Sequence, residues 1–218
     1  MKKSKIFLIV FFIACTGDLI SIVADLNVRF LFKPLIVPAL VGFYFMETEN
    51  RNSTFMRALL FCWAGDFVLM FEGQIYFIVG LVAFLIGHLF YIFSFRQLVW
   101  ETESTMLPTQ RVRYTFPILL AGTGLMVILY PVLGDLRMPV MVYAIVLMLM
   151  VNYALFRITR TTKESFIWVF GGAVFFMISD SMLAINKFHT SFFMADFAIM
   201  LTYIAAQFMI VRGVLKHE

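Results

Sequence analysis

Two aspartates stand in long apolar runs, where a charged side chain is difficult to hold. Asp66 lies in "FCWAGDFVLMF" (61–71) and Asp180 in "GGAVFFMISDSMLAINKF" (171–188). Charge exposed to lipid is costly, so a carboxyl group within a membrane-spanning segment points to function. A carboxylic acid in apolar surroundings tends to keep its proton, and a neighbouring carboxylate strengthens that tendency. Asp66 and Asp180 are therefore the candidate catalytic residues, and acid–base chemistry is their expected use.

The two aspartates also share a local pattern. Each has a phenylalanine five positions before it and a leucine three positions after it. This match favours a parallel repeat of four helices plus four, although a match of two positions also arises by chance in a chain with 27 Phe. The alternative to a catalytic role is a structural carboxylate paired with Lys33 or Lys187.

Further polar residues accompany the aspartates in the apolar segments. Those expected near the level of the aspartates are Lys33, Ser179, Asn186 and Lys187. His88 and Tyr91 lie deeper and three positions apart, so they share one helix face. They either form the floor of a polar cavity or make hydrogen bonds that hold helices together. All six are candidate substrate-binding residues.

Several kinds of catalytic site have no counterpart in the sequence. It contains no His-Glu-x-x-His zinc motif, no Gly-x-Ser-x-Gly nucleophile elbow and no glycine-rich phosphate loop. Its two cysteines, Cys15 and Cys62, have no metal-binding spacing. Ser179 has no histidine at its expected depth, which argues against a serine hydrolase. We expect neither a metal nor a cofactor.

The composition predicts that these residues are held by membrane helices. The 218 residues are 62% hydrophobic and 14% charged, against about 45–50% and about 25% in soluble domains. A helix needs about 20 apolar residues to cross about 30 Å of hydrocarbon. We therefore expect an all-α polytopic membrane protein with one transmembrane domain, 1–218, of eight helices at 5–24, 31–47, 54–72, 75–96, 113–131, 137–158, 165–184 and 192–214.

Two segments, one long connection and the N-terminus, differ from the other parts of this layout. The stretch 96–113 is the only candidate for a sizeable loop. The N-terminal "MKKSKIFLIVFFIAC" (1–15) is similar to a lipoprotein signal peptide, but the apolar run continues past Cys15. We expect it to be the first membrane helix.

Positive charge is distributed unevenly between the two ends of the expected helices. Of the 17 Lys and Arg, 13 fall on the side of the N-terminus. The other four are Arg29, Lys33, Arg137 and Lys187. By the positive-inside rule both termini face the cytoplasm. This distribution accounts for the net charge of +4, so no nucleic-acid partner is expected.

An ordered set of motifs resembles one family. "KPLIVP" (33–38), "AGDFVLM" (64–70), "GLVAFLIGHLFY" (80–91) and "GGAVFFMISDSMLAINKF" (171–188) together resemble the YhhN-like lysoplasmalogenase family of integral membrane proteins. Members hydrolyse the vinyl ether bond of lysoplasmalogens, releasing a fatty aldehyde and a glycerophospho-ethanolamine or -choline. The resemblance implies a lysophospholipid substrate taken from the bilayer, with Asp66 and Asp180 as catalytic residues. It is compatible with the cytoplasmic membrane of a bacterium as the location.

Hydrolysis of a vinyl ether needs an acid that still carries its proton near neutral pH. Protonation of the β carbon gives an oxocarbenium ion, and glycosidases meet a related ion with two carboxyl groups in different environments. Asp180 is expected to be the acid, because apolar residues dominate the turn before it, and Asp66 the base or the group that stabilises the cation. The alternatives are a proton-coupled transporter or lipid carrier that uses the same aspartates and an intramembrane aspartyl protease suggested by Gly65-Asp66.

Overall fold

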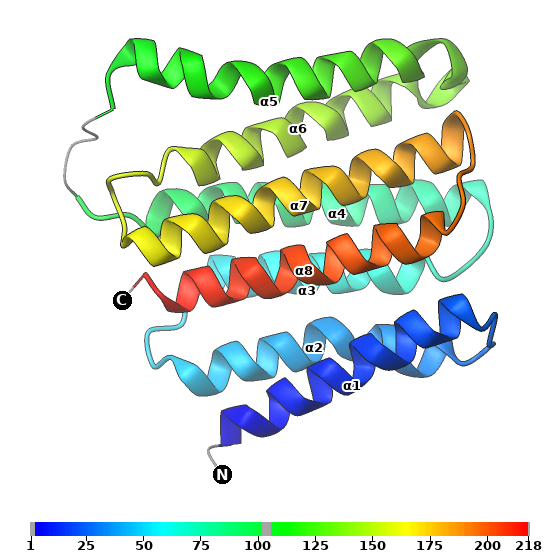
Figure 1. The fold of residues 1–218 in the computed structure, drawn as a ribbon, viewed down its shortest axis with the longest axis horizontal. Coiled ribbons are helices and arrows are strands. Elements are labelled where there is room, and N and C mark those ends of the chain that lie inside the picture. Colours follow the sequence, from blue (N-terminus) through cyan, green and yellow to red (C-terminus); the bar gives the residue numbers. More distant parts are fainter. Residues whose placement is uncertain (1–2, 102–105, 218) are drawn as a thin grey trace. The chain divides into compact units, whose positions relative to one another are not determined.

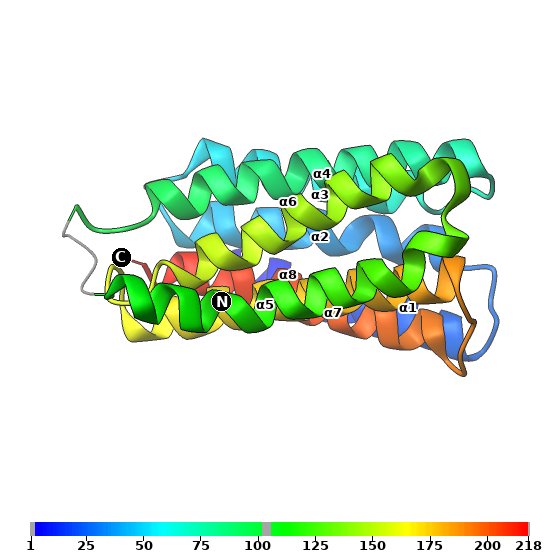
Figure 2. The same cartoon turned by 90° about the horizontal axis from the view of Figure 1, so that it is seen from above.

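The structure, a computed structural model, describes residues 3–101 and 106–217. This part of the chain is helical, with no strand (Figures 1 and 2). The α-helices are α1 (Lys3–Val23), α2 (Arg29–Glu47), α3 (Ser53–Val68), α4 (Gln74–Gln97), α5 (Pro108–Leu129), α6 (Arg137–Leu155), α7 (Lys163–Phe188) and α8 (Ala195–Leu215). Two short 3₁₀ helices, η1 (Tyr130–Val132) and η2 (Gly134–Leu136), connect α5 to α6.

Most of these helices are long and apolar enough to cross a membrane. Among the described residues seven helical stretches meet that description, and α3, with 16 residues, is shorter. The prediction of an all-α polytopic membrane protein is confirmed. The helix α1 runs without a break through Cys15, as expected of a membrane helix.

Three helices have an end that differs from the predicted range by four or five residues. The helix α3 ends at Val68 instead of residue 72, because Leu69–Phe71 form successive turns that lead into Gly73, whose φ is +124°. The helix α7 continues to Phe188 instead of 184 and includes polar residues that the prediction placed outside it. The helix α5 begins at Pro108 instead of 113, because proline suits the first turn of a helix. The expected loop at 96–113 is therefore shorter, and residues 102–105 lie outside the described part.

The chain divides into two compact units, Met1–Ser94 and Phe95–Glu218. In the first unit α2 packs against α1 and α3. Pro38, inside α2, has no N–H to offer the carbonyl of Pro34 four residues earlier. The indole of Trp63 on α3 donates a hydrogen bond of 2.9 Å to that carbonyl instead. A proline that breaks the bonding of one helix thus joins it to the next.

Small residues bring α3 and α4 of the first unit close together. A Cβ atom on Gly87 of α4 would lie 3.0 Å from Sγ of Cys62 and 3.3 Å from the carbonyl oxygen of Ala58, both on α3. A Cβ on Gly65 would lie 2.6 Å from the ring of Phe84. Close packing of this kind, with small residues at the contact, is how membrane helices associate.

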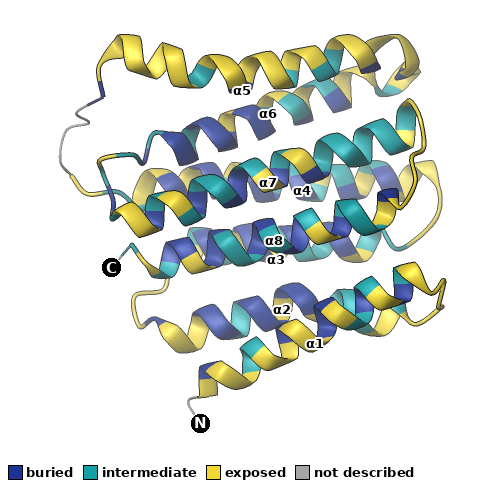
Figure 3. Cartoon of the chain, in the orientation of Figure 1, coloured by how far each residue is buried: buried dark blue, intermediate teal, exposed yellow. Residues whose placement is uncertain are grey.

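In the second unit α7 and α8 lie side by side along their length (Figures 1 and 2). A Cβ on Gly172 of α7 would lie 2.7 Å from Cγ1 of Ile210 and 2.9 Å from the carbonyl oxygen of Ala206. The absence of a side chain at Gly172 therefore lets α7 and α8 pack closely. By contrast, α5 is exposed along most of its length, as a helix that faces lipid would be (Figure 3).

A buried arginine joins the ends of three helices in the second unit. Arg157, in the turn after α6, is fully buried. Its Nε donates to the carbonyl of Leu98 at 3.2 Å, and its Nη2 donates to Oγ of Ser165 at 2.9 Å. The guanidinium also lies over the ring of Phe95, 5.8 Å from its centre. Burial lowers the pKa of Arg157 from 12.5 to about 10.

Candidate functional site

Asp66 lies in the last turn of α3, two residues before the helix ends at Val68. Its side chain is buried, with 4% of the residue exposed. The preceding residue, Gly65, lets the ring of Phe84 from α4 approach α3 closely. The carboxyl group is thus held at the end of a helix but within the packed interior.

Asp180 occupies a different position in its helix. It lies eight residues before the end of α7 at Phe188 and is only partly buried. The predicted helix ends at 72 and 184 placed Asp66 and Asp180 six and four residues from an end, against two and eight in the structure. The difference arises because apolar residues continue past the end of α3 and polar residues continue within α7.

The hydroxyl group of Tyr143 on α6 donates a hydrogen bond of 2.5 Å to Oδ2 of Asp180. Tyr143 is buried, so this bond lies in apolar surroundings. The bond fixes the orientation of the Asp180 carboxyl group, and a hydroxyl donor bonds more strongly to a carboxylate than to a neutral acid. The sequence offered only a tyrosine within an apolar helix, and it was not among the predicted site residues.

Ser179 and the end of α7 supply the other candidates of the second unit. Ser179 is buried and donates a hydrogen bond of 2.9 Å to the carbonyl of Ile199 on α8, so it links two helices. Asn186 and Lys187 lie in the last turn of α7, where Lys187 is exposed. Oδ1 of Asn186 is buried and has no hydrogen-bond partner among the described residues.

His88 and Tyr91 are both fully buried on α4. The ring of Phe84 lies 6.5 Å from that of His88, and the ring of Phe55 on α3 lies 5.8 Å from that of Tyr91. Aromatic neighbours at these distances make packing at least part of what the two residues do. Both residues lie three positions apart on α4, as the sequence requires of residues on one helix face.

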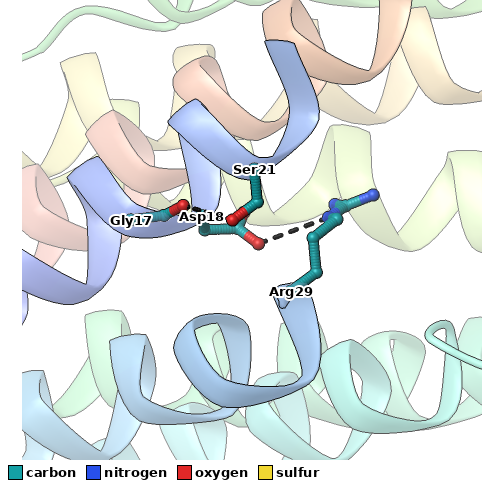
Figure 4. Close-up of polar contacts among 4 residues, drawn as sticks. All are labelled: Gly17, Asp18, Ser21 and Arg29. Carbon is teal, nitrogen blue, oxygen red and sulfur yellow. Dashed lines mark hydrogen bonds and ion pairs between the residues drawn. The ribbon is translucent and has the colours of Figure 1, made fainter. Parts of the chain in front are cut away.

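A buried ion pair in the first unit was not predicted. Asp18 of α1 is fully buried, and its Oδ1 lies 3.3 Å from Nε of Arg29, the first residue of α2 (Figure 4). Lys33, one turn further along α2, is close enough to act electrostatically on the same carboxyl group. The side chain of Arg29 is 34% exposed. The structure therefore places the candidate Lys33 beside an aspartate and an arginine that the prediction did not include.

Comparisons with known proteins extend over most of the chain. A model of the YhhN family matches residues 28–214. A lysoplasmalogenase of Mycobacterium bovis is 34% identical over 159 residues, which is 72% of this chain and 58% of that protein. The human lysoplasmalogenase TMEM86B is 30% identical over 188 residues, or 85% of this chain and 75% of that protein.

The match spans less than two thirds of the mycobacterial relative's own length, and a lysoplasmalogenase of Mycobacterium tuberculosis gives the same figures. No solved structure matches the chain. The family match covers α2 to nearly the end of α8, and with it Asp66 and Asp180. The chain belongs to the YhhN family.

Proposed function

We propose that this protein is a membrane-embedded hydrolase that cleaves the vinyl ether bond of lysoplasmalogens. The observation that carries the proposal is that relatives named lysoplasmalogenase, from a bacterium and from human, match 72% and 85% of the chain. The products would be a fatty aldehyde and glycerophospho-ethanolamine or -choline.

In the proposed reaction Asp66 and Asp180 divide the acid and base roles. The acid gives its proton to the β carbon of the vinyl ether, and the other carboxylate stabilises the resulting oxocarbenium ion and orients water. Water adds to the cation and loses a proton to give a hemiacetal, which collapses to the aldehyde and the glycerol hydroxyl. The bond from Tyr143 to Asp180 supports Asp180 as the carboxylate and Asp66, buried at the end of α3, as the acid. This assignment reverses the expectation from the sequence.

The substrate would enter from the lipid bilayer. The cations Lys33 and Lys187 are proposed to meet its phosphate. His88, Tyr91, Ser179 and Asn186 are proposed to line the remainder of the site. Both termini would face the cytoplasm, in keeping with the distribution of Lys and Arg, and the membrane would be a bacterial cytoplasmic membrane.

The test is release of aldehyde from a lysoplasmalogen by the purified protein. Wild-type protein should release it, whereas Asp66→Asn and Asp180→Asn should not, with unchanged helical content and membrane insertion. Glu72→Gln is the matched control, since Glu72 is an exposed carboxylate six residues after Asp66. Full activity in either aspartate variant would refute the pair.

The same assay separates the hydrolase from a transporter. If wild-type protein releases no aldehyde but moves protons or lysolipids across vesicle membranes, and the aspartate variants do not, the proposed hydrolase is wrong. A vesicle flux assay with the same three proteins provides this comparison.

A further inference from the structure

We propose that Asp18 holds Arg29 in place to bind the phosphate of a lysophospholipid headgroup, an inference that rests on the substrate class of the proposed function. Asp18 lies outside the residues matched by the family model, which begin at residue 28. The sequence alone indicates no role for Asp18, and for Arg29 it indicates only the side of the membrane.

Arg29 is held by a buried carboxylate on the neighbouring helix. Asp18 is fully buried on α1 and engages Nε of Arg29 at 3.3 Å. Oδ2 of Asp18 has no hydrogen-bond partner among the described residues, and Ser21, on the next turn, donates to the carbonyl of Gly17 rather than to the carboxylate. The carboxylate is thus available to fix the arginine at the Nε edge of its guanidinium group.

The terminal amino groups of Arg29 lie outside its contact with Asp18. Within residues 3–101 and 106–217 its two terminal amino groups donate no hydrogen bond. The far end of the guanidinium extends beyond the carboxylate (Figure 4), and the side chain is 34% exposed. The planar fork of arginine matches the oxygens of phosphate. One edge of the guanidinium is therefore anchored while the other is open to an anion.

Other positive groups lie near Arg29. Lys33 lies four residues after Arg29, on the same face of α2, and acts on the same carboxylate. Lys33 is thus a second cation beside the carboxylate that holds Arg29. Arg29 also begins α2, whose N-cap residue Val28 makes no side-chain cap hydrogen bond. The partial positive charge of a helix N-terminus adds to the attraction for an anion.

The location of Arg29, beside the exposed turn between α1 and α2, favours a lipid headgroup over free phosphate. Residues 24–28, which join α1 to α2, are all exposed and include the apolar Leu26 and Val28. The turn ends two apolar membrane helices, so it lies where phosphate groups of lipids lie. A lysophospholipid bound there has its phosphate at Arg29 and its chain in the apolar layer.

The experiment measures binding without hydrolysis. Purified protein in uncharged detergent is titrated with an ester lysophosphatidylethanolamine, with a monoacylglycerol of the same chain and with inorganic phosphate. Arg29→Gln should weaken binding of the lysophospholipid by about 10- to 100-fold, the effect expected for a charged hydrogen bond, and leave monoacylglycerol binding unchanged. The affinity of Arg29→Lys for the lysophospholipid should lie between those of wild-type and Arg29→Gln, because lysine keeps the charge but lacks the planar fork of the guanidinium group.

Arg137→Gln is the matched control for charge. Arg137 also begins a membrane helix, α6, but its Nε donates to the carbonyl of Tyr130 and not to a carboxylate. This variant should bind the lysophospholipid as wild-type does. Equal binding by Arg29→Gln and wild-type would overturn the proposal, as would binding of inorganic phosphate as tight as that of the lysophospholipid.

Asp18 is a positioning residue, so its effect should pass through Arg29. Asp18→Asn should weaken lysophospholipid binding by several fold, and raise KM more than it lowers kcat in the hydrolysis assay. In the Arg29→Gln background the same change should have no further effect on binding. The double variant also removes both charges and so leaves neither one buried alone. An Asp18 effect of equal size in both backgrounds would refute the positioning role.

The two proposals fail separately. Arg29-dependent binding of lysophospholipid by a protein that cleaves no lysoplasmalogen would support the headgroup site and refute the proposed hydrolase. Cleavage by a protein whose binding is unaffected by Arg29→Gln would refute the headgroup site alone.

Discussion

The hydroxyl group of Tyr143 on α6 donates a hydrogen bond to Oδ2 of Asp180 on α7. This bond joins two helices that are adjacent in the sequence and places a neutral donor against a carboxyl group in an apolar setting. It gives the Asp180 carboxyl group a fixed orientation, and it would stabilise the negative charge that a base in the proposed reaction needs.

Removal of the Tyr143 hydroxyl should therefore impair hydrolysis without loss of the fold. Tyr143→Phe keeps the ring and should lower kcat/KM for a lysoplasmalogen by about 10- to 100-fold, the usual effect of losing a hydrogen bond to a charged group. Tyr153→Phe, on the same helix, is the control, because the ring of Tyr153 contacts Arg96 and does not depend on the hydroxyl. Equal rates in wild-type and Tyr143→Phe would show that the bond has no catalytic role.

Substitution of Gly172 should destabilise the second unit. The methyl group of Gly172→Ala would lie 2.7 to 2.9 Å from atoms of Ile210 and Ala206 on α8, so the two helices must separate. We expect a loss of about 1–3 kcal/mol, measured as a lower Tm in detergent.

Gly124→Ala is the matched control in the same unit. A Cβ on Gly124 of α5 meets no atom within 4 Å. Alanine lowers the conformational entropy of the unfolded chain, so the substitution should stabilise the folded protein slightly. The opposite signs of the two changes test the packing directly. Similar Tm shifts for both variants would contradict close packing at Gly172.

Trp63 should depend on Pro38 for its contribution to stability. Trp63→Phe removes the donor to the Pro34 carbonyl and should cost about 1–3 kcal/mol, because that carbonyl is left unbonded. Pro38→Ala restores an N–H that can bond within α2, so Trp63→Phe should cost less in that background. A double-mutant cycle of thermal stabilities measures the coupling. If the stability effects of Trp63→Phe and Pro38→Ala simply add, the Trp63 hydrogen bond does not compensate for the N–H that Pro38 lacks.

Arg157 should make stability depend on pH in the alkaline range. Burial lowers the pKa of its guanidinium from 12.5 to about 10. Between these values the unfolded chain binds more protons than the folded one, so this group adds stability as pH rises from about 10. The Tm advantage of wild-type over Arg157→Gln should therefore be larger at about pH 11 than at about pH 8. A constant difference would contradict the shifted pKa.

The number and order of helices could be predicted from the sequence because apolar runs of about 20 residues have one stable form in lipid. Helix ends were less predictable. Residues 69–71 are apolar but form turns before Gly73, and Asn186 and Lys187 are polar but helical. Hydropathy reports where a segment lies in the membrane, whereas the end of a helix depends on local backbone bonds.

The candidate carboxyl groups could be recognised from the sequence, but their partners could not. Asp66 and Asp180 are conspicuous as acids in apolar runs. Tyr143 and Asp18 became informative only when the structure showed what they contact. Which faces of two helices meet depends on their rotation about their own axes, and helices that are apolar on all sides carry little pattern to set it.

The hydrogen bond from Trp63 to Pro34 has a consequence for biogenesis. As α2 leaves the ribosome it carries a carbonyl that its own backbone cannot satisfy, and a bare carbonyl in hydrocarbon costs several kcal/mol. Among the described residues the missing donor comes from Trp63 of α3. We therefore expect α2 to be released into the lipid together with α3, as a hairpin, so that the translocon must hold the first of the two helices until the second has been made.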